Sequence, residues 1–512
     1  MGVILLATIN AKWIHPSLAL RLLKANLGEY EHEAEILEFA IRQPFSEKLE
    51  SILKANPRIL GLSVAIWNHV ATKELLEAAF QTWGQRRPVV ILGGPEASSL
   101  DENAPLFRYA DYVVRGEGEI VFRELCAHIL KGSHAEPSVK TIPSAISVCG
   151  KFIAAKPVDL AAIDPGYRLY TQEDLTRKLT YVEASRGCPF DCEFCMSSLD
   201  KTVRFFPLAS FLKYMEDLFQ RGARAFKFLD RTFNLDTLRA ASILEFFLAR
   251  LEQAREARRH DHKAGHYVHF EMIPSRFPTE LRTLLMRFPP SSLRLEVGVQ
   301  TFNAKTSALI NRKSDPEKEL EHIVFLREKT NAVIHADLIA GLPGEDFASF
   351  ANGFNRLWQA LSGENRCGSP ENRENRMEIQ LGILKCLPGT PLARKAGELG
   401  LCFSEIPPYD VLETSALSCQ ELDRIKNFAR FWELLVNRGA VCATVLFSGN
   451  ESAYANAHTD ARADARAVFE RFMYIAGKLR ERFGRNWGID KKELLEAFNS
   501  VAASLAGAPV RL

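Results

Sequence analysis

The first 150 residues alternate between short apolar runs and longer stretches whose apolar residues have helical spacing. The runs predict five strands, at Val3–Thr8, Ala34–Phe39, Ile59–Ala65, Pro88–Leu92 and Tyr112–Val114. Stretches such as Ser17–Leu27 and Thr72–Trp83 predict the helices between them. Continuous apolar strands that alternate with helices are typical of a parallel sheet covered on both faces. We therefore expect an α/β domain of the doubly wound, Rossmann- or flavodoxin-like class over residues 1–140.

Residues 141–178 contain Pro143, Pro157, Pro165 and Gly166 without clear periodicity, and we interpret them as a linker. The alternation then resumes over residues 179–388. Six further strands are predicted, at Thr180–Ala184, Ala225–Leu229, Tyr267–Met272, Leu293–Val299, Val333–Ala340 and Met377–Leu384. This repeat predicts a partial (β/α)6 barrel with its chemistry at the carboxyl ends of the strands. From residue 389 to 512 the strand pattern fades, and helical spacing at Leu422–Val436 and Ala463–Phe483 predicts a helical C-terminal domain.

Composition narrows the class of protein without naming its function. The 512 residues are 47% hydrophobic and 25% charged, which excludes a mainly disordered chain. The 65 basic and 63 acidic residues give a net charge of +2, so neither a nucleic-acid partner nor a membrane surface is indicated. No stretch reads as a membrane span, and ten cysteines without an export signal favour a reducing, cytoplasmic setting.

Three cysteines follow the first predicted barrel strand at once, in the spacing C-x3-C-x2-C: Cys188, Cys192 and Cys195. Three thiolates this close can hold three corners of an iron–sulfur cubane and leave one iron open to another ligand. A structural zinc site would need a fourth ligand nearby, and the next histidine in the sequence is His260. The spacing also differs from that of the bacterial ferredoxins.

This motif, with the aromatic Phe194 before its last cysteine, resembles the radical S-adenosylmethionine (SAM) enzymes. The resemblance implies that Cys188, Cys192 and Cys195 bind a [4Fe–4S] cluster and that Phe194 lies beside the adenine of SAM. It also implies that SAM binds the open iron and is cleaved reductively to a 5′-deoxyadenosyl radical. An external one-electron reductant, a flavodoxin or ferredoxin, is then the expected partner.

Other barrel segments are consistent with SAM binding. Gly341 and Pro343, in a Gly-Leu-Pro-Gly-Glu loop after a predicted strand, would let the backbone approach the nucleoside. Gln300 ends a strand that looks like the family's penultimate-strand signature. Glu271 is a candidate for the amino group or ribose and Arg312 for the carboxylate, although a surface salt bridge explains either equally well.

The N-terminal domain carries three loops after predicted strands, which resemble those of the cobalamin-dependent branch of the superfamily. They contain the residues Ser63, then Gly93, Gly94, Pro95 and Glu96, then Gly116 and Glu117. Together with Asn10, these residues are expected to hold a cobalamin, with the glycines permitting close backbone approach. The sequence Asp-x-His-x-x-Gly, which supplies a histidine to cobalt, does not occur. We therefore expect the lower face of the cobalt to lack a protein histidine.

Further motifs extend the resemblance to an uncharacterised bacterial subgroup with its own helical C-terminal domain. Asp230 and Arg231 end the second barrel strand and are candidates for catalysis, with a buried ion pair as the competing interpretation. Four histidines, His260, His262, His266 and His269, fall in or beside a charged insertion, which indicates a solvated loop. The C-terminal region is expected to act as a lid over the barrel.

The leading hypothesis is a cobalamin-dependent radical SAM methyltransferase that methylates an unactivated centre of an unknown substrate. The same cofactors would also serve a radical rearrangement, oxidation or cyclisation. A methylthiotransferase would place three more cluster cysteines in the N-terminal domain, where residues 1–150 hold only Cys126 and Cys149. A non-catalytic cobalamin or iron–sulfur sensor is the remaining alternative.

Overall fold

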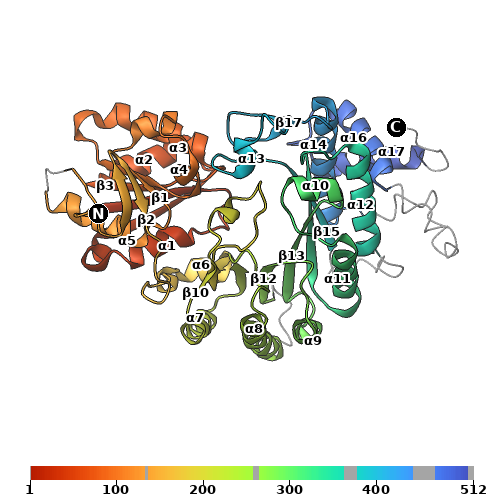
Figure 1. Cartoon of the computed structure of the whole chain (residues 1–512), viewed down its shortest axis with the longest axis horizontal. Helices are drawn as coiled ribbons and strands as arrows, with labels where there is room; N and C mark the ends of the chain where they lie inside the picture. The colour runs from red at the N-terminus through yellow and green to blue at the C-terminus, as the bar shows by residue number, and fades with distance from the viewer. Residues whose placement is uncertain (1, 133–135, 258–264, 363–376, 442–467, 506–512) are drawn as a thin grey trace. The chain divides into compact units, whose positions relative to one another are not determined.

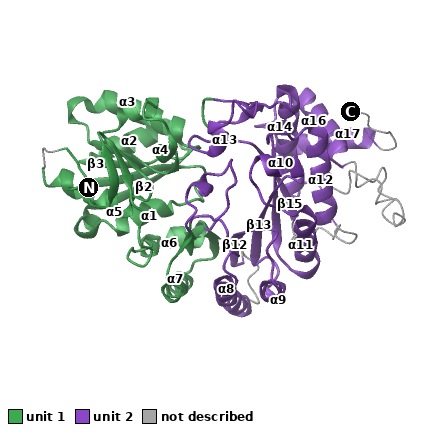
Figure 2. Cartoon of the chain, viewed as in Figure 1, with its two compact units in different colours: residues 1–186, 203–229, 405–408 green, residues 187–202, 230–404, 409–512 purple. Residues whose placement is uncertain are grey.

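The computed structural model describes residues 2–132, 136–257, 265–362, 377–441 and 468–505 (Figure 1). Two compact units divide the chain, and each is discontinuous in sequence (Figure 2). Unit 1 contains residues 1–186, 203–229 and 405–408, and unit 2 contains residues 187–202, 230–404 and 409–512. No helix in these described segments is long and apolar enough to cross a membrane.

Unit 1 is built on a seven-stranded sheet of order β2-β1-β3-β4-β5-β7-β6. Its parallel strands are β1 (Ile4–Asn10), β2 (Ala34–Ala40), β3 (Ile59–Ser63), β4 (Val89–Gly93) and β5 (Tyr112–Arg115). The intervening helices are α1 (Leu18–Ala25), α2 (Phe45–Ala55), α3 (His69–Trp83), α4 (Pro95–Ser99) and α5 (Gly118–Leu130). The order 2-1-3-4-5 is flavodoxin-like, and the five strands lie where the apolar runs predicted them.

Part of the expected linker, residues 141–178, adds two strands to this sheet. Strands β6 (Ala145–Cys149) and β7 (Phe152–Ala155) form an antiparallel hairpin, and β7 pairs parallel to β5. The run Phe152–Ala155 alternates between half-buried and buried residues, but four residues are too few for this alternation to be recognised in the sequence. The hairpin is followed by α6 (Gln172–Arg177).

The barrel strands are parallel within each unit. In unit 1, β8 (Thr180–Val182) pairs with β11 (Ala225–Phe228), and α7 (Leu208–Gln220) lies between them in sequence. In unit 2, β12 (Tyr267–Met272), β13 (Leu293–Gln300), β14 (Val333–Ala340) and β15 (Met377–Ile383) pair in that order. Their helices are α8 (Thr237–Ala257), α9 (Thr279–Arg287), α10 (Ala304–Leu309), α11 (Pro316–Lys329) and α12 (Phe347–Ser362). The predicted barrel repeat is confirmed.

The region after residue 388 starts with α13 (Pro391–Arg394) and a small hairpin, β16 (Cys402–Phe403) and β17 (Val411–Glu413). The helices α14 (Cys419–Trp432), η6 (Glu433–Asn437), α16 (Val468–Phe483) and α17 (Lys491–Ser504) follow. The rings of Phe428, Trp432 and Phe469 pack on Phe354 of α12, with centroids 4.9–5.6 Å apart. Because these helices complete the core of unit 2, removing them would expose buried aromatic rings. Truncation near residue 390 would therefore be a poor test of the lid role.

Candidate cobalamin and iron–sulfur site

A cavity of about 280 Å³ opens in unit 1 at the carboxyl ends of β3, β4 and β5. Its apolar wall comes from the sheet and from helices α1 and α5, and includes Leu20, Leu22, Leu62, Ile91 and Phe122. Its polar wall consists of Glu117, Glu119, Glu183 and Arg186. The carboxyl end of a doubly wound sheet is where this fold binds its ligands.

Five of the predicted cobalamin residues line this cavity: Ser63, Gly93, Gly94, Gly116 and Glu117. The other three, Asn10, Pro95 and Glu96, are not among the residues that line it. The Asn10 amide donates to Glu38 at 3.1 Å, and Pro95 begins helix α4. Glu96 is buried and lies 2.7 Å from His69, so its carboxylate is engaged within the fold.

Gly94 has φ +95°, and a Cβ there would lie 2.6 Å from the carbonyl oxygen of Val64. The glycine is thus required by the approach of the loop after β4 to the end of β3. Gly94→Ala should destabilise unit 1 by about 1–3 kcal/mol, because backbone must move, and should weaken cobalamin retention. Gly93→Ala is the matched control, since a Cβ at that neighbouring position meets only the Val114 carbonyl, at 3.7 Å. Equal melting temperatures for the two variants would contradict this account.

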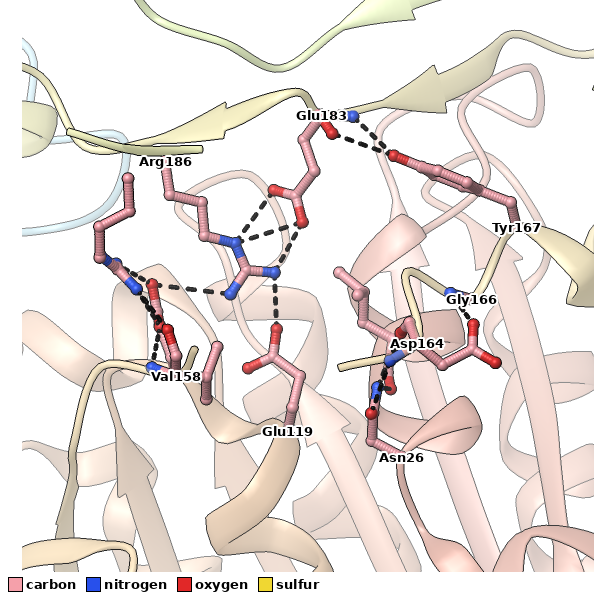
Figure 3. Close-up of polar contacts among 11 residues, drawn as sticks. Asn26, Glu119, Val158, Asp164, Gly166, Tyr167, Glu183 and Arg186 are labelled. Carbon is pink, nitrogen blue, oxygen red and sulfur yellow. Dashed lines mark hydrogen bonds and ion pairs between the residues drawn. The ribbon is translucent and has the colours of Figure 1, made fainter. Parts of the chain in front are cut away.

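The polar wall is a network of charged side chains centred on Arg186 (Figure 3). The Arg186 guanidinium donates to Glu183 at 2.6 Å and to Glu119 at 2.7 Å, and lies 3.6 Å from Glu117. Burial by itself would lower the pKa of Arg186, but attraction to these three carboxylates raises it overall. Arg186 therefore carries its charge at any physiological pH.

The remaining members complete the network from other segments. Arg204 donates to Glu117 at 3.0 Å and also to the Val158 carbonyl at 2.9 Å. Burial would raise the pKa of Glu117, but hydrogen bonds from Arg204 and from the Val158 amide lower it overall. Burial raises the pKa of Glu183, and Arg186 only partly opposes this. Three carboxylates and two guanidinium groups thus form one network of ion pairs.

The three motif cysteines lie in unit 2, on the loop that starts at Gly187. Gly187 has φ +91°, and a Cβ there would overlap the Thr202 carbonyl, so only glycine fits. The Cys188 amide donates to the Asp200 carbonyl at 2.9 Å, and the Glu193 amide donates to the Ile310 carbonyl at 3.0 Å. These bonds hold both halves of the loop before any metal is present.

Burial raises the pKa of Cys188, and the nearby Cys195 and Cys192 raise it further. Burial also raises the pKa of Cys192, while the charge of Arg312 opposes this shift. The thiols therefore influence one another, as groups that share a cluster must. Arg312 thus lies near Cys192 of the cluster loop, and it also donates to the Gly298 carbonyl. Its role towards SAM stays a prediction.

Among the described residues, no three His, Cys, Asp or Glu side chains converge on a single metal ion. Tetrahedral zinc holds its sulfurs about 3.7 Å apart, because each Zn–S bond is about 2.3 Å long. A cubane makes a different demand, since each cysteine binds its own iron. Three neighbouring thiols on one loop are compatible with that demand, and Cys188, Cys192 and Cys195 stay the predicted ligands.

The other predicted SAM residues are spread over unit 2. Phe194 lies half-buried within the cluster loop, and Pro343 is buried beside Gly341, which has φ +87° after β14. Gln300 ends β13 with φ +71°, and its buried Oε1 has no hydrogen-bond partner in the described structure. Gln300 as a contact for SAM stays a prediction.

Asp230 and Arg231, the two candidates for catalysis, lie in different surroundings. Asp230 is 2% exposed, and its charge acts on Arg239 of α8. Arg231 points to the surface and lies 3.6 Å from Glu271, with 57% and 41% of the two side chains exposed. Asp230 thus fits a structural role better, while Arg231 and Glu271 stay together as candidates.

Sequence reasoning missed a row of titratable groups on one face of the barrel strands. His269 of β12 lies 3.3 Å from Glu296, and His335 of β14 lies 2.9 Å from Glu378. The two imidazole rings stack with centroids 5.5 Å apart. The expectation of a solvated loop is therefore wrong for His269, whose side chain is 12% exposed. The alternation of Tyr267, His269 and Glu271 was the signal that placed it on a strand.

The remaining histidines of that group differ in status. His260 and His262 lie outside the described residues, and His266 lies just before β12.

Glu345 follows the Gly341–Gly344 loop and is 2% exposed. Burial raises its pKa to about 7, although Thr301 donates to it at 2.6 Å. The folded protein therefore binds this proton more tightly than the unfolded chain, so stability is lost as pH rises from about 4.5 through 7. In the Glu345→Gln variant the free energy of unfolding should depend less on pH. At pH 8 the variant should be more stable than the wild type by about 1–3 kcal/mol. Denaturation at pH 5 and pH 8 measures it, and an unchanged pH slope would contradict it.

Two family models match the chain. The B12 binding domain matches residues 4–126, and the radical SAM superfamily matches residues 182–356. The chain belongs to the cobalamin-binding radical SAM superfamily. The predicted cofactor classes, cobalamin and SAM with a [4Fe–4S] cluster, are confirmed at the level of these two domains. The cavity described above lies within the B12-binding domain and the adjoining first radical SAM strands.

Curated relatives and solved structures extend this comparison. The "Uncharacterized methyltransferase PH0819" of Pyrococcus horikoshii is 29% identical over 250 residues, covering 44% of this chain and 51% of its own. The "Cobalamin-dependent radical SAM methyltransferase TokK" of Streptomyces tokunonensis is 23% identical over 371 residues, covering 68% and 50%. The chain thus spans about half the length of these relatives. The solved cobalamin-dependent SAM radical enzyme OxsB shares the fold, with a TM-score of 0.61 and 13% identity over 98% of this chain and 79% of its own.

Proposed function

We propose that this protein is a cobalamin-dependent radical SAM methyltransferase that acts on an unactivated centre of its substrate. The observation that carries the proposal is the cavity at the carboxyl edge of a B12-binding domain, walled by the strand that leads into the cluster loop. The curated relatives named as methyltransferases support this reaction class. When bound, the cluster supplies an electron to SAM and cobalamin carries the methyl group.

The chain's own residues would divide the work. Cys188, Cys192 and Cys195 would hold the cluster on a loop fixed by backbone hydrogen bonds. Gln300 would contact SAM through its amide group, and Gly341 gives the loop after β14 its positive φ of +87°. The loops containing Ser63 and Gly116 would hold the cobalamin, and the apolar wall beside them excludes water from it.

The surroundings of Cys126 argue against a methylthiotransferase, which would need cysteines in the N-terminal domain to bind a second cluster. Cys126 lies on helix α5 and is fully buried in the apolar core, and burial raises its pKa far above the usual range. A thiol held neutral in this way is a poor metal ligand.

The proposal is tested by anaerobic incubation of reconstituted protein with cobalamin, a reductant and SAM carrying a labelled methyl group. Candidate substrates are metabolites chosen according to the enzymes that the neighbouring genes encode. Labelled methyl in the product together with 5′-deoxyadenosine supports it. Formation of product without label would indicate the rearrangement, oxidation or cyclisation alternative instead.

A further inference from the structure

The cluster loop of unit 2 is held at its middle by two other segments of the same unit. Glu193 stands between the predicted ligands Cys192 and Cys195. Its amide donates to the Ile310 carbonyl at 3.0 Å, and its carbonyl accepts from the Leu392 amide at 3.0 Å. Both polar groups of the Glu193 backbone are therefore fixed, so its side chain leaves the loop from a defined position.

Leu392 belongs to α13, a single helical turn that its own residues hold in shape. The Thr390 side chain accepts from the Ala393 amide at 3.2 Å and donates to the Leu387 carbonyl at 2.7 Å. Thr390 and Leu392 are both fully buried. The amides of a first helical turn have no partner within the helix, so the Leu392 amide can donate to the cluster loop.

Lys395 ends this turn and forms an ion pair with the same loop residue. Its Nζ lies 2.7 Å from Oε1 of Glu193, although the two residues are 202 positions apart in the sequence. The Glu193 side chain is 14% exposed and that of Lys395 is 49% exposed. Solvent screens a carboxylate with so little exposure only weakly, so its charge acts on its surroundings unless a cation balances it. Lys395 provides that cation.

Charge at this position matters because Glu193 directly follows the predicted ligand Cys192. Reductive cleavage of SAM begins when the external reductant gives one electron to the cluster, which makes the site more negative by one unit charge. An unbalanced carboxylate beside the site would oppose this step. The net charge around an iron–sulfur cluster is one of the factors that set its reduction potential.

We propose that the ion pair between Glu193 and Lys395 sets the reduction potential of the cluster, by balancing the negative charge next to Cys192. Lys395 is then a positioning residue, because it acts on the site through the Glu193 carboxylate. This inference rests on the proposed cluster and adds how the chain favours the entry of the electron that SAM cleavage requires.

The test is a redox titration of the anaerobically reconstituted full-length protein, followed by EPR in the absence of SAM. Lys395→Met leaves the Glu193 charge unbalanced and should lower the reduction potential, whereas Glu193→Gln removes the negative charge and should raise it. Each single variant should change the ratio of reduced to oxidised cluster at a fixed potential by about 3-fold to 10-fold, which corresponds to about 30–60 mV for one electron. The double variant and Lys395→Arg should both stay close to the wild type. A purely structural contact would not move the two single variants in opposite directions.

Asp191 provides the matched control for the carboxylate. It is the other sequence neighbour of Cys192 and lies 2.5 Å from Lys201, but the two side chains are 43% and 66% exposed. Because water and salt screen exposed charges, Asp191→Asn should shift the reduction potential much less than Glu193→Gln does.

Arg394→Met is the control for the lysine variant, because Arg394 donates to the Gly389 carbonyl at 3.0 Å and should leave the potential unchanged. The inference is overturned if Lys395→Met and Glu193→Gln shift the potential in the same direction or not at all. Should Lys395→Met retain no cluster, the comparison of Glu193→Gln with Asp191→Asn decides, and equal potentials for these two overturn the inference. If the wild type itself binds no [4Fe–4S] cluster, the proposed function fails instead.

Discussion

Replacing Cys188, Cys192 and Cys195 together by alanine is expected to abolish iron–sulfur absorption and all reductive cleavage of SAM. Anaerobically reconstituted wild-type protein should contain about four irons and four sulfides in this site. The triple variant loses every protein ligand, so no partial cluster is expected. Iron and sulfide analysis, charge-transfer absorption and release of 5′-deoxyadenosine measure the effect.

The exposed cysteines Cys149, Cys402 and Cys419 provide a matched control. Their triple alanine variant removes as many thiols and should keep the full cluster signal. The assignment is wrong if the motif variant retains its cluster or if the control variant loses it.

Arg186→Met is expected to destabilise the protein by about 3–5 kcal/mol, because it leaves the buried carboxylates of Glu119 and Glu183 without their shared cation. The deficit should shrink as the pH falls towards 5, since protonation then neutralises those carboxylates. Arg186→Lys keeps the charge but cannot donate to several carboxylates at once, so an intermediate stability is expected. Chemical denaturation at several pH values measures these differences.

Arg21 offers the control for this variant. It is also largely enclosed in unit 1, where it lies 2.9 Å from Glu38 and 2.8 Å from Asp174, but it does not line the cavity. Arg21→Met should cost similar stability while cobalamin affinity, measured under conditions where both variants are folded, falls only for Arg186→Met. Equal affinities would mean that the Arg186 network is purely structural.

The repeated strand pattern made most of the fold predictable. Strands such as Tyr267–Met272 and Val333–Ala340 formed where expected because their apolar alternation persists over six to eight residues. The β6–β7 hairpin was missed because its strands are short and because β7 pairs with β5, whose residues lie 39 positions earlier (Val113 opposite Phe152).

Candidate site residues were predictable where chemistry is carried by spacing, as with the three cysteines. Candidate site residues were less predictable where the direction of a side chain in the folded protein decides its role. Glu96 lies in a predicted ligand loop, yet it turns to His69, whereas Glu119 lines the cavity from three residues after the last loop glycine named. The pairing of Glu119 with Arg186 joins residues 67 positions apart, which no local pattern reveals.

The wall formed by Glu183, Arg186 and Leu229 has a consequence for modularity. A fragment that ends at residue 140, where the sequence pattern places the domain boundary, would keep Glu117 and Glu119 but lose both arginines that neutralise them. The B12-binding domain is therefore not a self-sufficient cassette. If recombination joined this domain to another barrel, the first barrel strand would have to be transferred with it. Otherwise the new barrel would have to supply a cation for Glu117 and Glu119.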